Sequence, residues 1–290
     1  MTNSTYARTY VPTYACLLAA VTLVFTSTAF GQQGVVRTGV DATFAPHAMV
    51  RLGGGVEGFN VDLAKEIARR LGKTLELDAT TFSGLIPGLN SKRYDWIAAP
   101  TTVTKERAES LLFTEGYLNT NYQFVVPRKA NDIKALTDLK GKNVSVNKGS
   151  AYEGWAKANA DKYGFKYTVY DTNPDAVQAV IAGRADTNMT GNTVAAWSVK
   201  QNKATLKLST HVVDTGLVWA VPFRKDDKAG RDEISMAIKC MKKDGTFALM
   251  HEKWFGTKPA ANSWTVKIAP GHGVPDMPGY DATPVTLKCS

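Results

Sequence analysis

Cysteine, histidine and long apolar runs are scarce in this sequence, and each shortage excludes a class of protein. The 290 residues contain 3 Cys and 4 His, which form no spacing typical of a metal site or a Ser-His-Asp set. The formal net charge is +9, but no block of Lys or Arg is long enough to track a phosphate backbone. We therefore expect no nucleic-acid partner, no metal and no cofactor.

The first 31 residues differ in kind from the rest. They contain no acid and one basic residue, Arg8, which precedes an apolar stretch at residues 15–25 and the small residues Ala29 and Gly31. This order is typical of a secretory signal peptide, and we expect cleavage after Gly31 and a periplasmic location. A retained anchor is the less favoured alternative, because the apolar stretch is short for a bilayer. No later stretch is long enough either, so the mature chain should be soluble.

Removal of the signal peptide leaves two cysteines, Cys240 and Cys289. In an oxidising compartment a matched pair usually forms a bridge, whereas two isolated, widely spaced cysteines are poor metal ligands. We predict a disulfide that fastens the carboxy-terminal tail to the body.

An amphipathic helix is expected over residues 58–72. Apolar residues recur every four positions from Leu63 to Leu71, Asn60 is placed to cap the start, and Gly72 is placed to end the helix.

Strands and helices alternate along most of the chain. Strands are expected at 35–40, 74–77, 143–146, 167–170 and 185–189, and one more strand should end at residue 99. Further helices are expected at 85–90, 152–162, 175–183, 232–241 and 251–255. This alternation predicts an α/β fold with two lobes, each a mostly parallel sheet flanked by helices. Strands near 117–123 and 215–220 would join lobe 1 (32–119 and 217–256) to lobe 2 (120–216). The cleft between two such lobes is a place where small ligands bind.

The tail at 257–290 is rich in Pro and Gly, which break regular elements. Disorder is one interpretation of this composition. We favour a C-terminal extension packed on the body, because Trp264, Ile268 and Tyr280 offer apolar contacts and Cys289 an anchor.

Several short motifs occur in order and resemble one family. They are 39–46 (GVDATFAP), 58–64 (GFNVDLA), 82–89 (FSGLIPGL), 104–107 (TKER), 113–117 (FTEGY), 138–144 (DLKGKNV), 148–150 (KGS), 243–246 (KDGT) and 252–256 (EKWFG). Together they resemble the bacterial extracellular solute-binding proteins of family 3, over about residues 35–256. The resemblance implies the two-lobed type II periplasmic binding fold and a monomer. It also implies a receptor that closes on a polar amino acid and docks on an inner-membrane ABC permease.

The resemblance implies that Arg107 grips the carboxylate of the ligand. A guanidinium offers two parallel donors to a carboxylate, which lysine does not. Thr102 and Ser150 match positions that also meet the carboxylate, the second of them at a helix start where free amides attract anions. Each of these residues is also compatible with a structural role, Arg107 on the surface and the other two as helix caps.

Other positions match the rest of the family's ligand site. The main-chain carbonyl of Ala99 would accept from a ligand amine, and Phe44 and Phe82 would sandwich the ligand, with core packing as their alternative role. Asp41 and Tyr152 match positions that contact polar ligand ends in some members.

Gly191 departs from the family pattern. In amino acid binders this place in the second lobe typically holds an aspartate for the ligand's ammonium, and Pro100 also replaces a small polar residue. Burying an ammonium without a counter-charge costs several kcal/mol. Three alternatives follow: a carboxylate without a free amine, a substituted or quaternary nitrogen among aromatic rings, or an acid such as Asp41 that reaches the ammonium from another side.

Two other functions are open to this fold. An enzyme resembling cyclohexadienyl dehydratases would need a general acid, and Gly191 and Asn192 supply no carboxyl at the expected position. A solute sensor would have to dock on a separate receptor. We expect a binding protein for an amino acid or a similar carboxylate, without catalytic residues.

Overall fold

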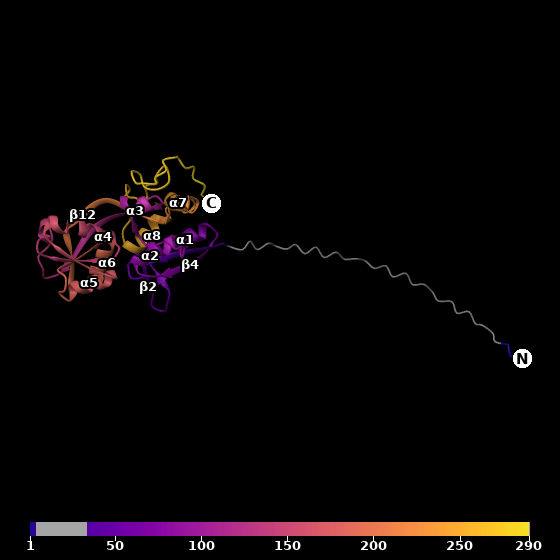
Figure 1. Ribbon diagram of the computed structural model, residues 1–290, viewed down its shortest axis with the longest axis horizontal. Coiled ribbons are helices and arrows are strands. Elements are labelled where there is room, and N and C mark those ends of the chain that lie inside the picture. Colours follow the sequence, from indigo (N-terminus) through magenta and orange to yellow (C-terminus); the bar gives the residue numbers. More distant parts are fainter. Residues whose placement is uncertain (4–33, 290) are drawn as a thin grey trace. The chain divides into compact units, whose positions relative to one another are not determined.

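The computed structural model describes residues 1–3 and 34–289. The predicted signal peptide and its cleavage site lie outside the described residues, apart from the first three positions. The described chain has the predicted α/β fold with two lobes, which are joined by two long strands (Figure 1).

The first lobe contains a parallel sheet of three strands in the order β4-β1-β5. These strands are β1 (Val35–Val40), β4 (Thr74–Ala79) and β5 (Trp96–Ile97). The helices of this lobe come from both ends of the sequence: α1 (Phe59–Arg70), α2 (Phe82–Asn90), α7 (Lys228–Lys243) and α8 (Thr246–Phe255). Both α7 and α8 contact α1, so the first lobe is discontinuous in sequence.

Helix α1 has the predicted periodicity, because Leu63 and Ile67 are fully buried. The helix begins after Gly58, whose φ of 145° lies in a region that favours glycine. A Cβ at this position would lie 2.2 Å from the carbonyl oxygen of His47. No other residue fits this start without moving the backbone.

The predicted capping role of Asn60 is wrong. Asn60 lies inside the first turn of α1 and is fully buried, and its side chain donates to the carbonyl oxygen of Ala98 (2.5 Å) and to the hydroxyl of Tyr117 (2.7 Å). The side-chain amide is used in the core because each of its groups finds a partner there.

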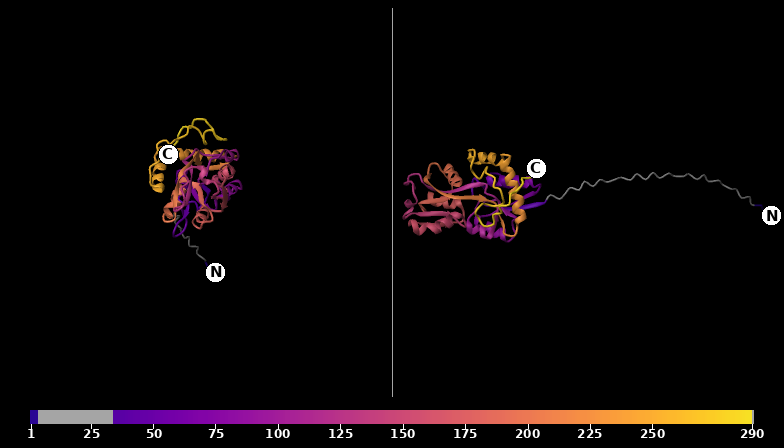
Figure 2. Two further views of the ribbon diagram at one scale, coloured as in Figure 1. Left: turned by 90° about the vertical axis from the view of Figure 1, so that its left-hand side faces the viewer. Right: turned by 90° about the horizontal axis from the view of Figure 1, so that it is seen from above.

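A second sheet has the strand order β10-β9-β11-β8-β12-β6. Its strands are β6 (Thr101–Thr102), β8 (Leu118–Pro127), β9 (Asn143–Asn147), β10 (Lys166–Tyr170), β11 (Thr187–Gly191) and β12 (Leu206–Ala220). Strands β9, β10 and β11 are parallel, whereas β8 and β12 are antiparallel to each other. At its far end β12 pairs with β6, where Trp219 lies opposite Thr102. The two long strands thus pass between the lobes (Figure 2).

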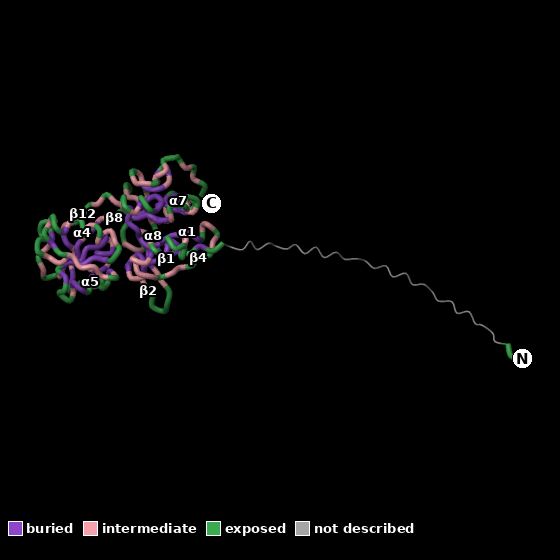
Figure 3. Tube along the Cα trace, viewed as in Figure 1, coloured by how far each residue is buried: buried purple, intermediate pink, exposed green. Residues whose placement is uncertain are grey.

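Three helices flank the second sheet: α4 (Ala151–Tyr163), α5 (Asn173–Ile181) and α6 (Asn192–Gln201). Strand β9 is largely buried and β11 is buried along its whole length, whereas no residue of β10, at the edge of the sheet, is fully buried. In Figure 3 the buried residues of this lobe gather between α4 and α5. The shorter elements are β2 (Met49–Val50), β3 (Val56–Glu57), α3 (Lys105–Ser110), β7 (Leu111–Phe113), the 3₁₀ helix η1 (Leu136–Leu139) and β13 (Pro222–Arg224). The residue boundaries of the two lobes given above remain a prediction.

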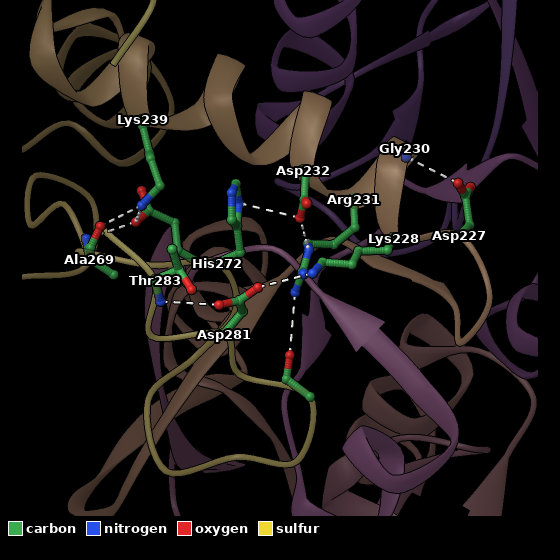
Figure 4. A network of polar contacts seen from close by, with 12 residues as sticks. Asp227, Lys228, Gly230, Arg231, Asp232, Lys239, Ala269, His272, Asp281 and Thr283 are labelled. Carbon is green, nitrogen blue, oxygen red and sulfur yellow. Dashed lines mark hydrogen bonds and ion pairs between the residues drawn. The ribbon is translucent and has the colours of Figure 1, made fainter. Parts of the chain in front are cut away.

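The tail after α8 is irregular but contacts the body. The backbone N–H of Trp264 donates to Asn119 Oδ1 (2.9 Å) at the start of β8, and Lys239 Nζ donates to the carbonyl oxygen of Ala269 (Figure 4). The predicted disulfide between Cys240 and Cys289 is present, with the two Cα atoms 5.5 Å apart. In the part of the chain that the structure describes, no helix is both long and apolar enough to cross a membrane.

Candidate functional site

A small cavity of about 10 Å³ lies between the two lobes, which are in contact around it. It is lined by Phe44, Phe82, Pro100, Thr102, Arg107, Asn147, Ser150, Ala151 and Tyr152. Six of the predicted ligand-binding residues belong to this lining: Phe44, Phe82, Thr102, Arg107, Ser150 and Tyr152. The other three, Asp41, Ala99 and Gly191, are buried nearby but outside it. The lining also includes Asn147, which no sequence motif indicated.

Arg107 connects the two lobes at this cavity. It lies on α3, whose first turn is capped by Thr104, the side chain of which accepts the backbone N–H of Arg107 (3.2 Å). Its Nη1 donates to the carbonyl oxygen of Thr102 (2.9 Å), and its Nη2 donates across the cleft to the carbonyl oxygen of Gly149 (2.9 Å). Burial lowers the pKa of Arg107, but a guanidinium remains protonated in proteins.

Two aromatic rings form one wall of the cavity. Phe44 is buried at 7% exposure, and Phe82 is half-buried at the start of α2. The guanidinium carbon of Arg107 lies 5.5 Å from the centre of the Phe82 ring, a distance at which the cation is attracted to the ring. The wall therefore also helps to place the cation.

Thr102 is hydrogen-bonded through both its side chain and its main chain. Its hydroxyl accepts the indole N–H of Trp219 (3.0 Å), and its carbonyl oxygen accepts from Arg107. The carbonyl oxygen of Ala99 accepts from the hydroxyl of Thr101 (3.0 Å), which leaves one lone pair for another donor.

Ser150 is the N-cap of α4. Its hydroxyl accepts the backbone N–H of Glu153 (3.2 Å) and donates to the carbonyl oxygen of Asn147 (2.5 Å). Capping one amide leaves other N–H groups of the first turn free, and these favour an anion at the cavity.

Two tyrosines from the second lobe lie near Arg107. The rings of Tyr122 and Tyr152 meet edge to face, with centres 4.9 Å apart. Burial raises the pKa of both phenols, that of Tyr122 to about 12, so both stay neutral at physiological pH. They contribute neutral hydrogen-bonding groups and no negative charge.

The space beside Gly191, where the family resemblance implies an aspartate, is filled by other side chains. A Cβ on Gly191 would lie 2.9 Å from Trp219 Cζ2 and 2.9 Å from the hydroxyl oxygen of Tyr152. Both distances are shorter than a normal carbon contact, so a larger residue requires its neighbours to move. The sequence shows that the acid is absent, and the structure shows what occupies its space.

Asp41 is an acid close to the aromatic wall. It is 1% exposed, and its Oδ1 accepts from the backbone N–H (3.0 Å) and the hydroxyl (2.6 Å) of Thr43. Burial raises the pKa of Asp41, while the hydrogen bonds from Thr43 oppose this rise. One carboxylate oxygen is therefore bonded to its own loop, and Asp41 lies outside the cavity lining.

His47 makes a second contact between the lobes, which no sequence motif indicated. It is fully buried, its Nδ1 lies 3.0 Å from Asn60 Oδ1, and its Nε2 lies 2.8 Å from the hydroxyl of Thr193 at the start of α6. Its ring also meets Trp219 edge to face, with centres 4.7 Å apart. Burial lowers the pKa of His47 to about 3, so the ring is neutral here.

We expect acid to destabilise the protein through His47. Between about pH 6.5 and pH 3 the unfolded chain binds a proton that the folded chain excludes, so the free energy of unfolding falls as pH falls. The contribution approaches about 1.4 kcal/mol per pH unit in this window and vanishes above it. Urea unfolding of wild type and His47→Gln at several pH values between about 7.5 and 4.5 measures it. Parallel curves for the two proteins would show that His47 does not carry this dependence.

No group of three or more His, Cys, Asp or Glu side chains gathers as a metal site within residues 34–289. The cavity instead combines one cation, one wall of two aromatic rings and several neutral polar groups. Two α/β lobes that are joined by two long strands and touch across such a cavity define a ligand-binding protein of the type II periplasmic fold.

The chain belongs to the bacterial extracellular solute-binding proteins, family 3, whose family model matches residues 36–257. The L-cystine-binding protein TcyJ of Escherichia coli K12 is 31% identical over 227 residues, which cover 78% of this chain and 84% of that protein. The arginine-binding extracellular protein ArtP of Bacillus subtilis 168 is 31% identical over 247 residues, covering 83% and 94% of the two chains.

Solved structures agree with this assignment. An ancestral arginine-binding protein bound to arginine superimposes with a TM-score of 0.73 at 37% identity, covering 77% of this chain and 99% of that chain. An ancestral amino acid-binding protein, a precursor of cyclohexadienyl dehydratase, superimposes with a TM-score of 0.69 at 33% identity, covering 77% of this chain and 95% of that chain. The predicted family and fold are therefore confirmed.

Proposed function

We propose that this chain is the periplasmic solute-binding protein of an ABC importer, and that it closes its lobes around an amino-acid-like carboxylate held by Arg107. One observation carries this proposal. Arg107 is the single cation among the nine described residues that line the cavity, and none of the nine is an acid. An anion is therefore the ligand that neutralises the site.

The relatives support the same ligand class. The named proteins bind L-cystine and arginine, and both ligands carry a carboxylate that a guanidinium can hold through two parallel hydrogen bonds. In the closed cleft this carboxylate would take the guanidinium donors that now face the carbonyl oxygens of Thr102 and Gly149. Exclusion of water strengthens each charged hydrogen bond at this place.

The finer parts of the proposal concern location and partners. A signal peptide cleaved after Gly31 would deliver a monomer to the periplasm, where the closed form would dock on the inner-membrane permease. The enzymatic alternative has one supporting observation, the similarity to a precursor of cyclohexadienyl dehydratase. The described cavity lining, however, offers no carboxyl group or histidine as a general acid.

Replacing Arg107 by alanine tests the proposal directly. Calorimetric titration of the mature protein with a panel of L-amino acids and other small carboxylates should identify ligands, and Arg107→Ala should weaken each of them. Charge-assisted hydrogen bonds of this type contribute about 1.5–3 kcal/mol, which corresponds to roughly ten- to a hundredfold in affinity. Arg107→Lys is the matched control, because it keeps the charge and loses the paired donors; it should restore part of the affinity. Undiminished binding by Arg107→Ala would exclude the clamp.

A further inference from the structure

Asn147 carries an unused hydrogen-bond acceptor at the cavity. It is the last residue of β9, lies in the cavity lining and is 1% exposed. Its Nδ2 donates to the carbonyl oxygen of Lys148 (3.1 Å), and because a carbonyl only accepts, this bond fixes which end of the amide is nitrogen. Within the described part of the chain, Asn147 Oδ1 has no hydrogen-bond partner. Buried polar atoms are rarely left unpaired, so this oxygen calls for a donor from a ligand.

The charge of the cavity limits what that donor can be. The carboxylate of a ligand neutralises Arg107, and no acid in the described lining remains for a second cation. Tyr122 and Tyr152 lie near Arg107 as neutral phenols. A ligand with a free ammonium would leave one positive charge uncompensated in the closed cleft, which is unfavourable.

A carboxylate does not fit on β11 either. The space next to Gly191 is occupied by Trp219 and Tyr152, as described above. Trp219 is itself tied to Thr102 through its indole N–H, so the ring is not free to turn away. Strand β11 therefore offers no acidic acceptor for a ligand nitrogen, and β9 supplies a neutral one in Asn147, in addition to the carbonyl oxygen of Ala99.

We propose that Asn147 Oδ1 receives an uncharged N–H of the ligand, and that the solute is a monoanionic carboxylate with an amide-type nitrogen, such as an N-acylated amino acid, and not a free amino acid. This inference rests on the proposed function, since Arg107 must hold the carboxylate. Asp41 is the competing acceptor. One of its oxygens is bonded to Thr43, and its other oxygen is buried without a hydrogen-bond partner in the described chain.

Matched compounds separate the two acceptors. The probes are L-phenylalanine, N-acetyl-L-phenylalanine and 3-phenylpropionate, with the corresponding sets built on alanine and glutamine, each titrated calorimetrically into the mature protein. In at least one set we expect the wild type to bind the N-acetyl compound roughly tenfold more tightly than the other two, the factor that one hydrogen bond of about 1.4 kcal/mol provides.

Three variants complete the experiment. Asn147→Leu should lower the affinity for the N-acetyl compound to the affinity for the nitrogen-free acid. Its affinity for the nitrogen-free acid should stay within about threefold of wild type, which would also show that the cleft is intact. Asn147→Asp, which is isosteric and adds a charge, should reverse the order in favour of the free amino acid. If Asn147→Leu does not unfold cooperatively, Asn147→Ser takes its place. Asp41→Asn should leave the order of the three compounds unchanged.

Two results would overturn this inference. If the wild type prefers the free amino acid and Asp41→Asn abolishes that preference, Asp41 holds an ammonium and the inference is wrong while the proposed function stands. If Asn147→Leu lowers the affinity for the N-acetyl compound and for the nitrogen-free acid by the same factor, a contact between Asn147 and the ligand nitrogen is likewise rejected. If the wild type binds none of the carboxylates in any set, the proposed function fails, and this inference fails with it.

Discussion

Replacing Glu115 with glutamine is expected to lower the free energy of unfolding by about 3–5 kcal/mol, because it leaves two buried lysines without their counter-charge. Lys239 Nζ lies 2.7 Å from Glu115 Oε2, and Lys242 Nζ lies 2.9 Å from Glu115 Oε1. All three side chains are fully buried. Removing one partner of a buried ion pair leaves the other charge buried and unpaired, which destabilises the protein far more than the loss of a pair at the surface.

The same cluster attaches the C-terminal extension. The backbone N–H of Ala269 donates to Glu115 Oε2 (2.8 Å), and Lys242 Nζ donates to the carbonyl oxygen of Lys267 (2.8 Å). Burial lowers the pKa of Lys242 to about 8, and the neighbouring Glu115 carboxylate opposes this shift. We therefore expect Glu115→Gln to loosen the tail as well as to destabilise the body.

Urea unfolding followed by circular dichroism measures the effect, and hydrogen exchange at the amide of Ala269 reports on the tail. Glu252→Gln on the exposed face of α8 is the matched control, and it should change stability by no more than about 0.5 kcal/mol. A loss below about 1 kcal/mol for Glu115→Gln would mean that the cluster is not the buried charged group described here.

Removing the disulfide is expected to cost about 4 kcal/mol. The bridge joins residues separated by 49 positions, and closing a loop of this length restricts the unfolded chain by an amount that the chain-entropy relation places near this value. The remaining tail contacts, such as Lys228 with Asp281 and Trp264 with Asn119, do not depend on the bridge. The double variant Cys240→Ser with Cys289→Ser should therefore fold and keep its ligand cleft, but unfold at lower urea concentration.

Wild type treated with a thiol reductant provides the matching measurement, since Cys289 is exposed and the bridge can be reached by the reductant. Reduced wild type and the double variant should show the same midpoint of unfolding. Equal stability of the oxidised and reduced wild type would contradict a stabilising role for the bridge. Unchanged titration of a carboxylate ligand by the double variant would confirm that the effect is confined to stability.

Local sequence patterns predicted much of the fold. The spacing of Leu63 and Ile67 predicted α1, and the alternation of short apolar runs with helical segments predicted the parallel strands of both sheets. These features can be predicted from the sequence because each depends on residues a few positions apart. Asn60 shows the limit of such reasoning. A local rule assigned it to a cap, whereas partners from two distant segments place it in the core.

The candidate site was predicted in part, and through resemblance more than through local pattern. Phe44, Phe82, Thr102, Arg107, Ser150 and Tyr152 line one cavity although they come from both lobes. No sequence pattern marks Asn147, because an asparagine at a strand end is ordinary and its unpaired oxygen depends on groups from other segments. The roles of all these residues in binding remain predictions that the titrations above test.

The amino-acid sequence by itself determined the family, the two-lobed α/β fold, the pairing of two cysteines and the absence of an acid at Gly191. Only the tertiary structure decided that Trp219 and Tyr152 fill the space beside Gly191 and that Asn147 Oδ1 has no hydrogen-bond partner in the described chain. It also decided that Glu115 joins two lysines beneath the tail. The reason is physical. Helices, strands and motifs follow from neighbouring residues, whereas the cost of a buried charge or an unpaired oxygen depends on groups that the fold brings together from more than a hundred residues away.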